Sequence, residues 1–85
     1  MMKIEFSSTA FKDYRRWQEK NPQIAERINL LLKEIIVHPK DGLGKPEPLK
    51  WDLSGWWSRR IDREHRLIYK IENDTLYVLS CRYHY

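Results

Sequence analysis

The chain has 85 residues, a single cysteine and a formal net charge of +4, and 41% of its residues are hydrophobic. A chain of this length forms one domain with a small core, which we expect to span residues 1–85. The lone cysteine, Cys81, excludes an internal disulfide and fits a reducing compartment, so we expect a cytoplasmic protein. We expect neither a signal peptide nor a membrane span, because no apolar run is long enough for either.

The positive charge is distributed evenly along the chain. Residues 1–44 and residues 45–85 each contain eight Lys or Arg and six Asp or Glu. Any basic patch is therefore assembled by folding. The charge favours an anionic partner such as nucleic acid, but by itself it does not identify one.

The N-terminus predicts a strand followed by a helix. Residues 3–6 alternate polar and apolar side chains, which is typical of a short strand. Ser7 or Ser8 is a suitable N-cap for a helix over residues 9–20.

A second helix is predicted directly after the first. Asn21 provides an N-cap and Pro22 occupies the first helical position. The helix ends near His38, because Pro39 cannot continue it. Its apolar residues recur every three or four positions and form one stripe: Ile24, Ile28, Leu31, Leu32, Ile35 and Ile36.

The C-terminal half predicts an antiparallel meander. Residues 40–48 are rich in Gly and Pro and read as a loop, after which the apolar period changes to two. Short polar links imply antiparallel neighbours among four predicted strands, over residues 49–53, 56–62, 65–71 and 76–83. The expected fold is therefore α+β: an N-terminal strand, two helices, then an antiparallel sheet packed on the helices, with its other face wet.

Alternation assigns side chains to the two faces of the last strands. Leu67 and Tyr69 are expected on one face, and Arg66 on the other. In the last strand Leu76, Val78, Ser80, Arg82 and His84 are expected to share a face, opposite Tyr77, Leu79, Cys81, Tyr83 and Tyr85. Whether Arg66 and His84 share a face depends on the register.

The residue types needed to cut RNA without a metal are all present. A general base removes the 2′-hydroxyl proton, cations stabilise the phosphoryl oxygens, and a general acid protonates the 5′-oxygen that leaves. Glu47 is held between Pro46 and Pro48, which restrict the backbone on both sides. The remaining candidates are the cations Lys45, Lys50, Arg59, Arg60, Arg66 and Arg82 and the imidazole of His84.

Each candidate also has a structural interpretation. Glu47 can be a solvated loop acid, Arg66 a surface charge on a strand, and His84 part of a frayed chain end. The tryptophans are more typical of the core or of sheet edges than of base-stacking platforms. His, Cys and Asp spacing predicts no metal site, and Cys81 is expected to pack in the core. From the residues alone, a small basic α+β domain directed at RNA remains one option among several.

Several long motifs resemble a known family. The chain contains K-P-E-P-L-K, then L-S-G-W-W-S-R-R-I, then E-H-R-L-I-Y, and ends in C-R-Y-H-Y. Together these are similar to the YoeB/Txe family of bacterial toxins, within the RelE superfamily, over the whole chain. The resemblance implies a microbial-ribonuclease-like sheet and a ribosome-dependent endoribonuclease that cuts mRNA in the ribosomal A site without a metal or other cofactor.

The resemblance also implies roles for particular residues and partners. Glu47 corresponds to the general base, Arg66 to the residue that stabilises the phosphate, and His84 to the general acid. Assisting or RNA-binding positions are Lys50, Tyr85, Arg59 and Arg60. The implied partners are a YefM-like antitoxin, the ribosome with its mRNA, a second copy in a homodimer, and operator DNA for the toxin–antitoxin complex.

Two alternatives to an active nuclease stay open. The first is a basic module that blocks translation by occupying RNA or the ribosome without cutting. The second is a degenerate family member that only pairs with its antitoxin.

Overall fold

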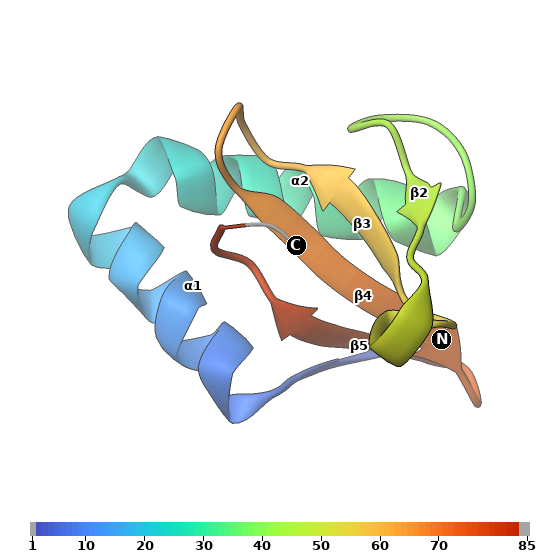
Figure 1. Cartoon of the computed structure of the whole chain (residues 1–85). Coiled ribbons are helices and arrows are strands. Elements are labelled where there is room, and N and C mark those ends of the chain that lie inside the picture. The colour runs from blue at the N-terminus through green and yellow to red at the C-terminus, as the bar shows by residue number, and fades with distance from the viewer. Residues whose placement is uncertain (1, 84–85) are drawn as a thin grey trace.

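The computed structural model describes residues 2–83, and in this part of the chain two helices lie on one side of a five-stranded sheet (Figure 1). The sheet order is β1-β5-β4-β3-β2, in which β1 is parallel to β5 and every other pair is antiparallel. The predicted α+β class is confirmed, and the parallel N-terminal strand makes the sheet mixed. The elements are β1 (Lys3–Phe6), α1 (Ser8–Lys20), α2 (Pro22–Val37), β2 (Glu47–Pro48), the 3₁₀ turn η1 (Trp51–Leu53), β3 (Trp57–Arg60), β4 (Arg66–Glu72) and β5 (Thr75–Ser80).

Both predicted helices are confirmed. Ser7 caps α1, because its hydroxyl accepts a hydrogen bond from the Ala10 N–H at 3.0 Å. Pro22 begins α2 and Asn21 precedes it, but the Asn21 side chain makes no capping hydrogen bond, contrary to expectation. None of the helices in residues 2–83 is long and apolar enough to cross a lipid bilayer.

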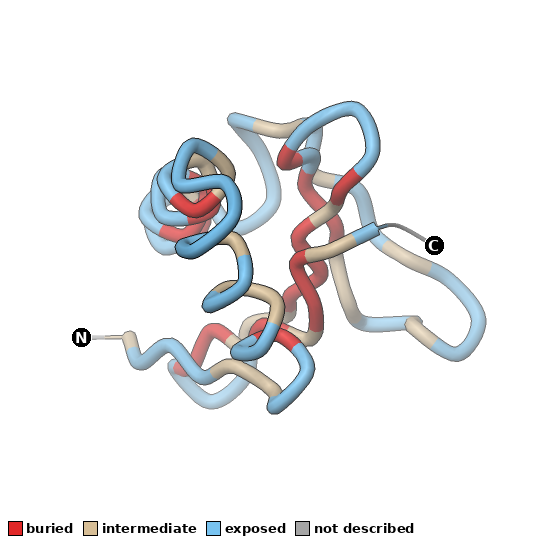
Figure 2. Tube along the Cα trace, turned by 90° about the vertical axis from the view of Figure 1, so that its left-hand side faces the viewer, coloured by how far each residue is buried: buried red, intermediate tan, exposed pale blue. Residues whose placement is uncertain are grey.

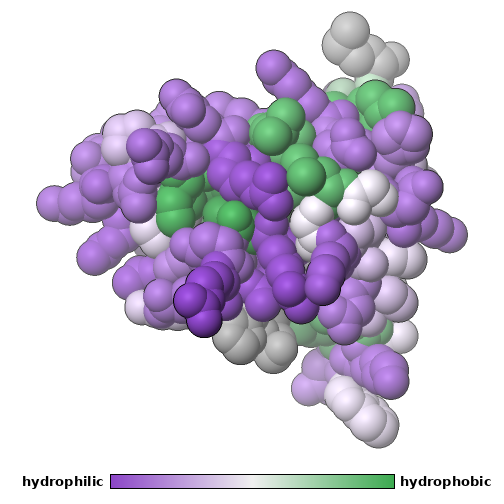
Figure 3. Space-filling model, turned by 90° about the horizontal axis from the view of Figure 1, so that it is seen from above, coloured by the Kyte–Doolittle hydropathy of each residue, from purple (hydrophilic) through white to green (hydrophobic). Residues whose placement is uncertain are grey.

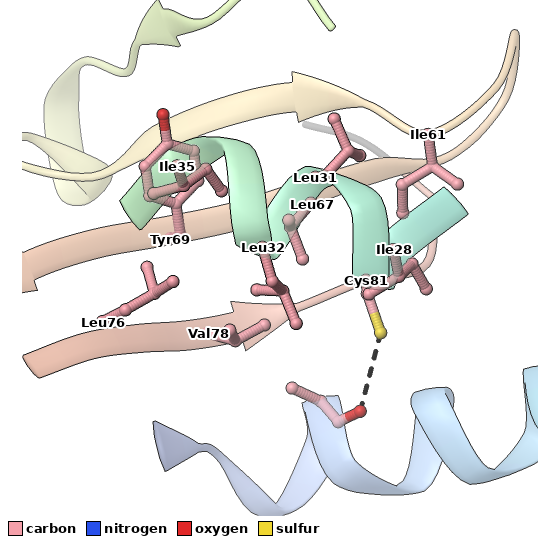
Figure 4. Close-up of a cluster of buried hydrophobic side chains, with 11 residues drawn as sticks. Ile28, Leu31, Leu32, Ile35, Ile61, Leu67, Tyr69, Leu76, Val78 and Cys81 are labelled. Atoms are coloured by element: carbon pink, nitrogen blue, oxygen red, sulfur yellow. Dashed lines mark hydrogen bonds between the residues drawn. The ribbon is translucent and has the colours of Figure 1, made fainter. Parts of the chain in front are cut away.

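The core fills the space between the helices and the inner face of the sheet. Figure 2 shows the buried backbone concentrated where the strands face the helices, with the segment around β2 on the far side of the sheet. Figure 4 shows how α2 and the strands meet, with the Cys81 thiol directed at the Ala10 carbonyl of α1, 3.6 Å away. The buried residues of this core cluster are Ala10, Ile28, Leu31, Leu32, Ile35, Ile61, Leu67, Tyr69, Leu76, Val78 and Cys81.

The predicted strand over residues 49–53 is wrong. The structure has a two-residue strand, β2, inside the segment that was expected to be a loop, and residues 51–53 form η1 instead. Trp51 adopts a left-handed φ of 59°, and the Ser54 N–H donates to its carbonyl at 3.0 Å. A backbone that turns in this way cannot continue a strand.

A β-bulge changes the faces of the last strand. Tyr69 pairs with Val78 but Ile68 pairs with Ser80, so one extra residue lies between the two pairs. Leu76 and Val78 face the core as expected. Ser80, however, lies on the Ile68 side and the next residue, Cys81, enters the core, which corrects the predicted alternation.

The face of the sheet opposite the helices, called here the helix-free face, is less wet than expected. Ser58, Ile68 and Ser80 form a cross-strand row in its centre, and all three are at most 8% exposed. The ends of this face carry charged and aromatic side chains, and they are the accessible part.

Candidate active site

A pocket of about 180 Å³ opens on the helix-free face where β2, β3 and β4 meet. Its walls combine a carboxylate, three cations and a hydroxyl above an apolar floor. The lining residues are Lys45, Glu47, Leu49, Ser58, Arg60, Arg66 and Ile68.

Glu47 reaches this pocket because of how β2 is held. The chain turns sharply at Gly44 and Lys45, whose φ values are 86° and 51°, and then enters the stiff segment from Pro46 to Pro48. Glu47 pairs with Ser58 of β3, and directly opposed residues on neighbouring strands project to the same face. The carboxylate is therefore exposed beside the Ser58 hydroxyl.

Arg66 faces Arg60 directly across the β3–β4 pair. Opposed like charges destabilise a sheet, so a pair of arginines in this register favours an anion between them. Arg66 is held in place: its Nη1 donates to the carbonyls of Asp62 at 2.8 Å and His65 at 3.1 Å. The arrangement suits a phosphate group.

The positive field extends beyond the pocket. Arg60 and Arg66 also border a second hollow of about 420 Å³, whose rim carries Arg27, Arg63 and the single acid Asp62. Hydrophilic side chains cover most of the face seen from above in Figure 3, between smaller apolar groups. Because four arginines and one aspartate line this hollow, the end of the sheet near Arg66 is basic.

Hydrogen bonds hold residues 81–83 against α1 and against the end of the sheet near Arg66. Trp17 Nε1 donates to the Cys81 carbonyl at 2.9 Å, and the Cys81 N–H donates to Asp13 Oδ2 at 3.4 Å. The Tyr83 N–H donates to Nδ1 of buried His65 at 2.7 Å, and the Tyr83 carbonyl accepts from the Arg66 N–H at 2.8 Å. The backbone of Tyr83 therefore lies beside Arg66.

The predicted site residues, apart from Arg59, fall into three groups. Glu47, Arg60 and Arg66 come together in the pocket, whereas exposed Lys50 precedes η1 and is not among the lining residues. His84 and Tyr85 lie outside the described residues. Of the lining residues, Ser58 escaped the sequence reasoning, although it is two positions before Arg60 in a strand and so shares its face.

Arg59, predicted as an assisting or RNA-binding residue, is buried and has no surface with which to contact RNA. Arg59 has no exposed surface, and its guanidinium donates to three carbonyls of the loop after α2, those of His38, Asp41 and Leu43. Its Nε also donates to the Tyr69 hydroxyl at 3.1 Å. Arg59 therefore holds the loop to the sheet from the core side.

Two buried groups on the core side have raised pKa values. Burial raises the pKa of the Cys81 thiol to about 12, and the nearby Asp13 carboxylate adds to the shift. Burial also raises the pKa of the Tyr69 phenol, although Arg59 opposes this effect through its hydrogen bond and its charge. Both groups are thus neutral at physiological pH. Within residues 2–83, no three His, Cys, Asp or Glu side chains are grouped so that they could hold a metal ion.

Comparison with known proteins gives the family. The model of the YoeB-like toxin of bacterial type II toxin–antitoxin systems matches residues 6–85. The chain belongs to this family. Toxin YoeB of Synechocystis sp. is 52% identical over 84 residues, which cover 99% of this chain and 98% of the relative.

Solved structures of YoeB proteins share the fold. The YoeB/ParE toxin from Agrobacterium tumefaciens has a TM-score of 0.96 at 43% identity and covers 99% of this chain and 100% of its own. Staphylococcus aureus YoeB is 44% identical and is solved in two forms. Its complex with YefM has a TM-score of 0.92 and covers 100% of this chain and 99% of the relative's chain. Its dimer has a TM-score of 0.93 and covers 99% of this chain and 98% of the relative's chain. The resemblance to the YoeB/Txe family is confirmed.

Proposed function

We propose that this toxin is a ribosome-dependent endoribonuclease that cuts mRNA in the ribosomal A site. The observation that carries the proposal is the convergence of Glu47, Arg60 and Arg66 on one pocket of the helix-free face. These residues come from three different strands, and two directly opposed arginines are unfavourable for stability alone. The whole arrangement places a carboxylate beside two cations. It suits a base placed next to a bound phosphate.

The reaction proposed is an internal transesterification. Glu47 takes the proton of the 2′-hydroxyl, and the 2′-oxygen attacks the adjacent phosphorus. Arg66, with Arg60 opposite, stabilises the charge that develops on the phosphoryl oxygens. The bond to the 5′-oxygen breaks, His84 supplies the proton to that oxygen, and the products carry a 2′,3′-cyclic phosphate and a 5′-hydroxyl. By resemblance to the family, Lys50 and Tyr85 assist the reaction.

Dependence on the ribosome follows from how little of the substrate the pocket encloses. The pocket has room for one phosphodiester, and Glu47 on its rim is exposed. In-line attack needs the 2′-oxygen, the phosphorus and the 5′-oxygen to be aligned. Holding them in this geometry removes a large share of the activation free energy of cleavage. A ribosome that fixes the mRNA supplies that alignment, and a ribosomal substrate implies a cytoplasmic protein.

The proposed partners follow from the family. A YefM-like antitoxin neutralises the toxin, as the complex solved for the Staphylococcus aureus relative suggests, and that relative's dimer supports a homodimer here. Operator DNA is bound only by the toxin–antitoxin complex. The basic end of the sheet near Arg66 is then the surface that the ribosome or the antitoxin covers.

The test is cleavage of a translated mRNA, mapped by primer extension with and without ribosomes. Glu47→Gln keeps the size and removes the base, so we expect cleavage to fall by about 10²- to 10⁴-fold, the usual contribution of a general base. Glu19→Gln is the matched control, because Glu19 is an exposed carboxylate on α1, on the helix side. Circular dichroism checks that each variant is folded.

If Glu47→Gln cleaves mRNA at the wild-type rate, Glu47 has no part in the mechanism. If the wild type and the variant both inhibit translation and neither produces cleaved mRNA ends, the protein is instead a module that acts by occupancy alone.

A further inference from the structure

A second group of side chains crosses the helix-free face one row beyond the central one. Lys70 of β4 pairs with Tyr77 of β5, and Tyr77 pairs with Glu5 of β1. Trp56 precedes β3, one position before the Trp57–Tyr69 pair, so it lies opposite Lys70. The contacts agree: Lys70 Nζ is 4.7 Å from the centre of the Trp56 ring and 5.9 Å from that of Tyr77.

This row borders a pocket of its own. Trp56, Tyr77 and Glu5 of this row line a hollow of about 240 Å³ together with Phe6, Ser7, Val78 and Leu79. The hollow shares no residue with the Glu47–Arg66 pocket. Neither aromatic ring is fully buried. The hollow therefore offers aromatic surface to a ligand on the same face as the candidate active site.

The spacing relates this hollow to the phosphate site. Arg66, Ile68 and Lys70 alternate along β4 and share the helix-free face. Four residues of a strand span about 13 Å. An RNA strand that passes over β4 with a phosphodiester at Arg66 therefore brings a neighbouring nucleotide to Lys70.

The charges of the row select the part of the nucleotide. Two carboxylates frame it: Glu5 lines the hollow, and Glu72 forms an ion pair with Lys70 at 3.8 Å. These acids repel a phosphate and largely balance the lysine. An uncharged, flat group is the better occupant, and every nucleobase has a π-face that stacks on an aromatic side chain.

We propose that Trp56, Lys70 and Tyr77 form a nucleobase subsite next to the Glu47–Arg66 pocket. A base beside the cleaved linkage stacks on the aromatic rings, while Lys70 stays paired with Glu72 beside them. The subsite rests on the nuclease function proposed above. It adds a hold on the substrate that does not depend on the reacting groups.

The experiment combines protein variants with abasic mRNA. Ribosome-dependent cleavage is measured for wild type, Trp56→Leu and Tyr77→Leu, on mRNA that is intact or lacks one base next to the cleaved linkage. Loss of a stacked base should lower kcat/KM of the wild type by about 5- to 150-fold. The variants should lose a similar factor on intact mRNA and almost nothing more on abasic mRNA.

Phe11→Leu is the matched control, because Phe11 is an aromatic residue of α1 that is 52% exposed on the helix side. It should leave every rate and the abasic penalty unchanged.

Two other results would overturn the subsite. An abasic penalty of equal size in wild type and variants means that the base is held elsewhere. Weaker binding of the purified antitoxin by Tyr77→Leu, with an unchanged abasic penalty, makes the row an antitoxin contact. If no mRNA is cut at all, the nuclease proposal fails separately from the subsite. The wild type and the two variants are then compared by their affinity for ribosomes that carry intact or abasic 2′-deoxy mRNA.

Discussion

Arg59 and Arg60 are adjacent in β3 and should give opposite phenotypes. Arg59 lies on the core side with no exposed surface, and Arg60 lies exposed on the helix-free face at the pocket. Arg59→Leu leaves three loop carbonyls and the Tyr69 hydroxyl without their donor. Arg60→Ala removes one of two opposed positive charges and no buried contact.

The structure sets the size of the Arg59 effect. Each buried group that loses its partner costs ~1–3 kcal/mol, but the freed loop over residues 39–43 is exposed and can turn its carbonyls to water. We therefore expect Arg59→Leu to lower the free energy of unfolding by about 3–4 kcal/mol. This is a large part of the roughly 5–15 kcal/mol that is typical of whole domains. For a domain of this size that lowers Tm by roughly 12–30 °C.

Arg60→Ala should change stability by no more than ~0.5 kcal/mol, because it is a surface change that also relieves repulsion. Cleavage should fall by about 10- to 100-fold, the value of one charge-assisted hydrogen bond to the reacting phosphate. Arg59→Lys should be intermediate in stability, since a lysine cannot reproduce the branched donor set.

The assay is urea and thermal unfolding followed by circular dichroism, together with kcat/KM of cleavage on ribosomes, for both variants. If the unfolding free energy of Arg59→Leu lies within about 0.5 kcal/mol of the wild-type value, the spread expected for surface changes, and cleavage is still lost, the structural role of Arg59 is refuted. In that case the original prediction of an RNA contact is restored.

Three further predictions concern buried or strained positions. His65→Leu removes the acceptor of the Tyr83 N–H and should destabilise the protein by ~1–3 kcal/mol in urea unfolding, with His65→Gln closer to wild type. Because the pKa of Cys81 in the folded protein is raised to about 12, the stability that its neutral thiol contributes is fully present below pH ~9 and is lost as the pH rises toward 12. Cys81→Ala should therefore reduce the fall of the unfolding free energy with pH in urea titrations at alkaline pH. Gly44→Ala places a Cβ 3.0 Å from Leu31 at a left-handed φ and should cost ~1–3 kcal/mol in the same unfolding assay.

The helices and the β4–β5 hairpin were predictable because their signals are local. The apolar stripe of α2, the capping Ser7 and the polar turn at Asn73 and Asp74 are all readable within a few residues. The φ values of that turn, 52° and 58°, are those of the two-residue hairpin loops that match strand twist. Local periodicity therefore carried most of the architecture.

The errors arose where a local pattern was overruled by the backbone or by distant partners. A left-handed Trp51 converts an alternating segment into η1, and a bulge beside Ile68 sends Cys81 into the core. Arg59 could have been separated from Arg60 by alternation alone, because it shares its face with Trp57, which packs against the core. Treating the two arginines as a pair ignored the strand period.

The strand order explains why residues so distant in sequence meet at Arg66. β4 lies between β3 and β5, so Arg66 can be approached from both flanks of the sheet. Glu47 reaches it from the side of the edge strand β2, across β3, and Tyr83 reaches it from the side of β5. In-line displacement needs a base on the side of the attacking oxygen and an acid on the side of the oxygen that leaves. The structure therefore places a carboxylate on one flank of the central arginine and Tyr83 on the other, so the proposed reaction has access to Arg66 from both sides.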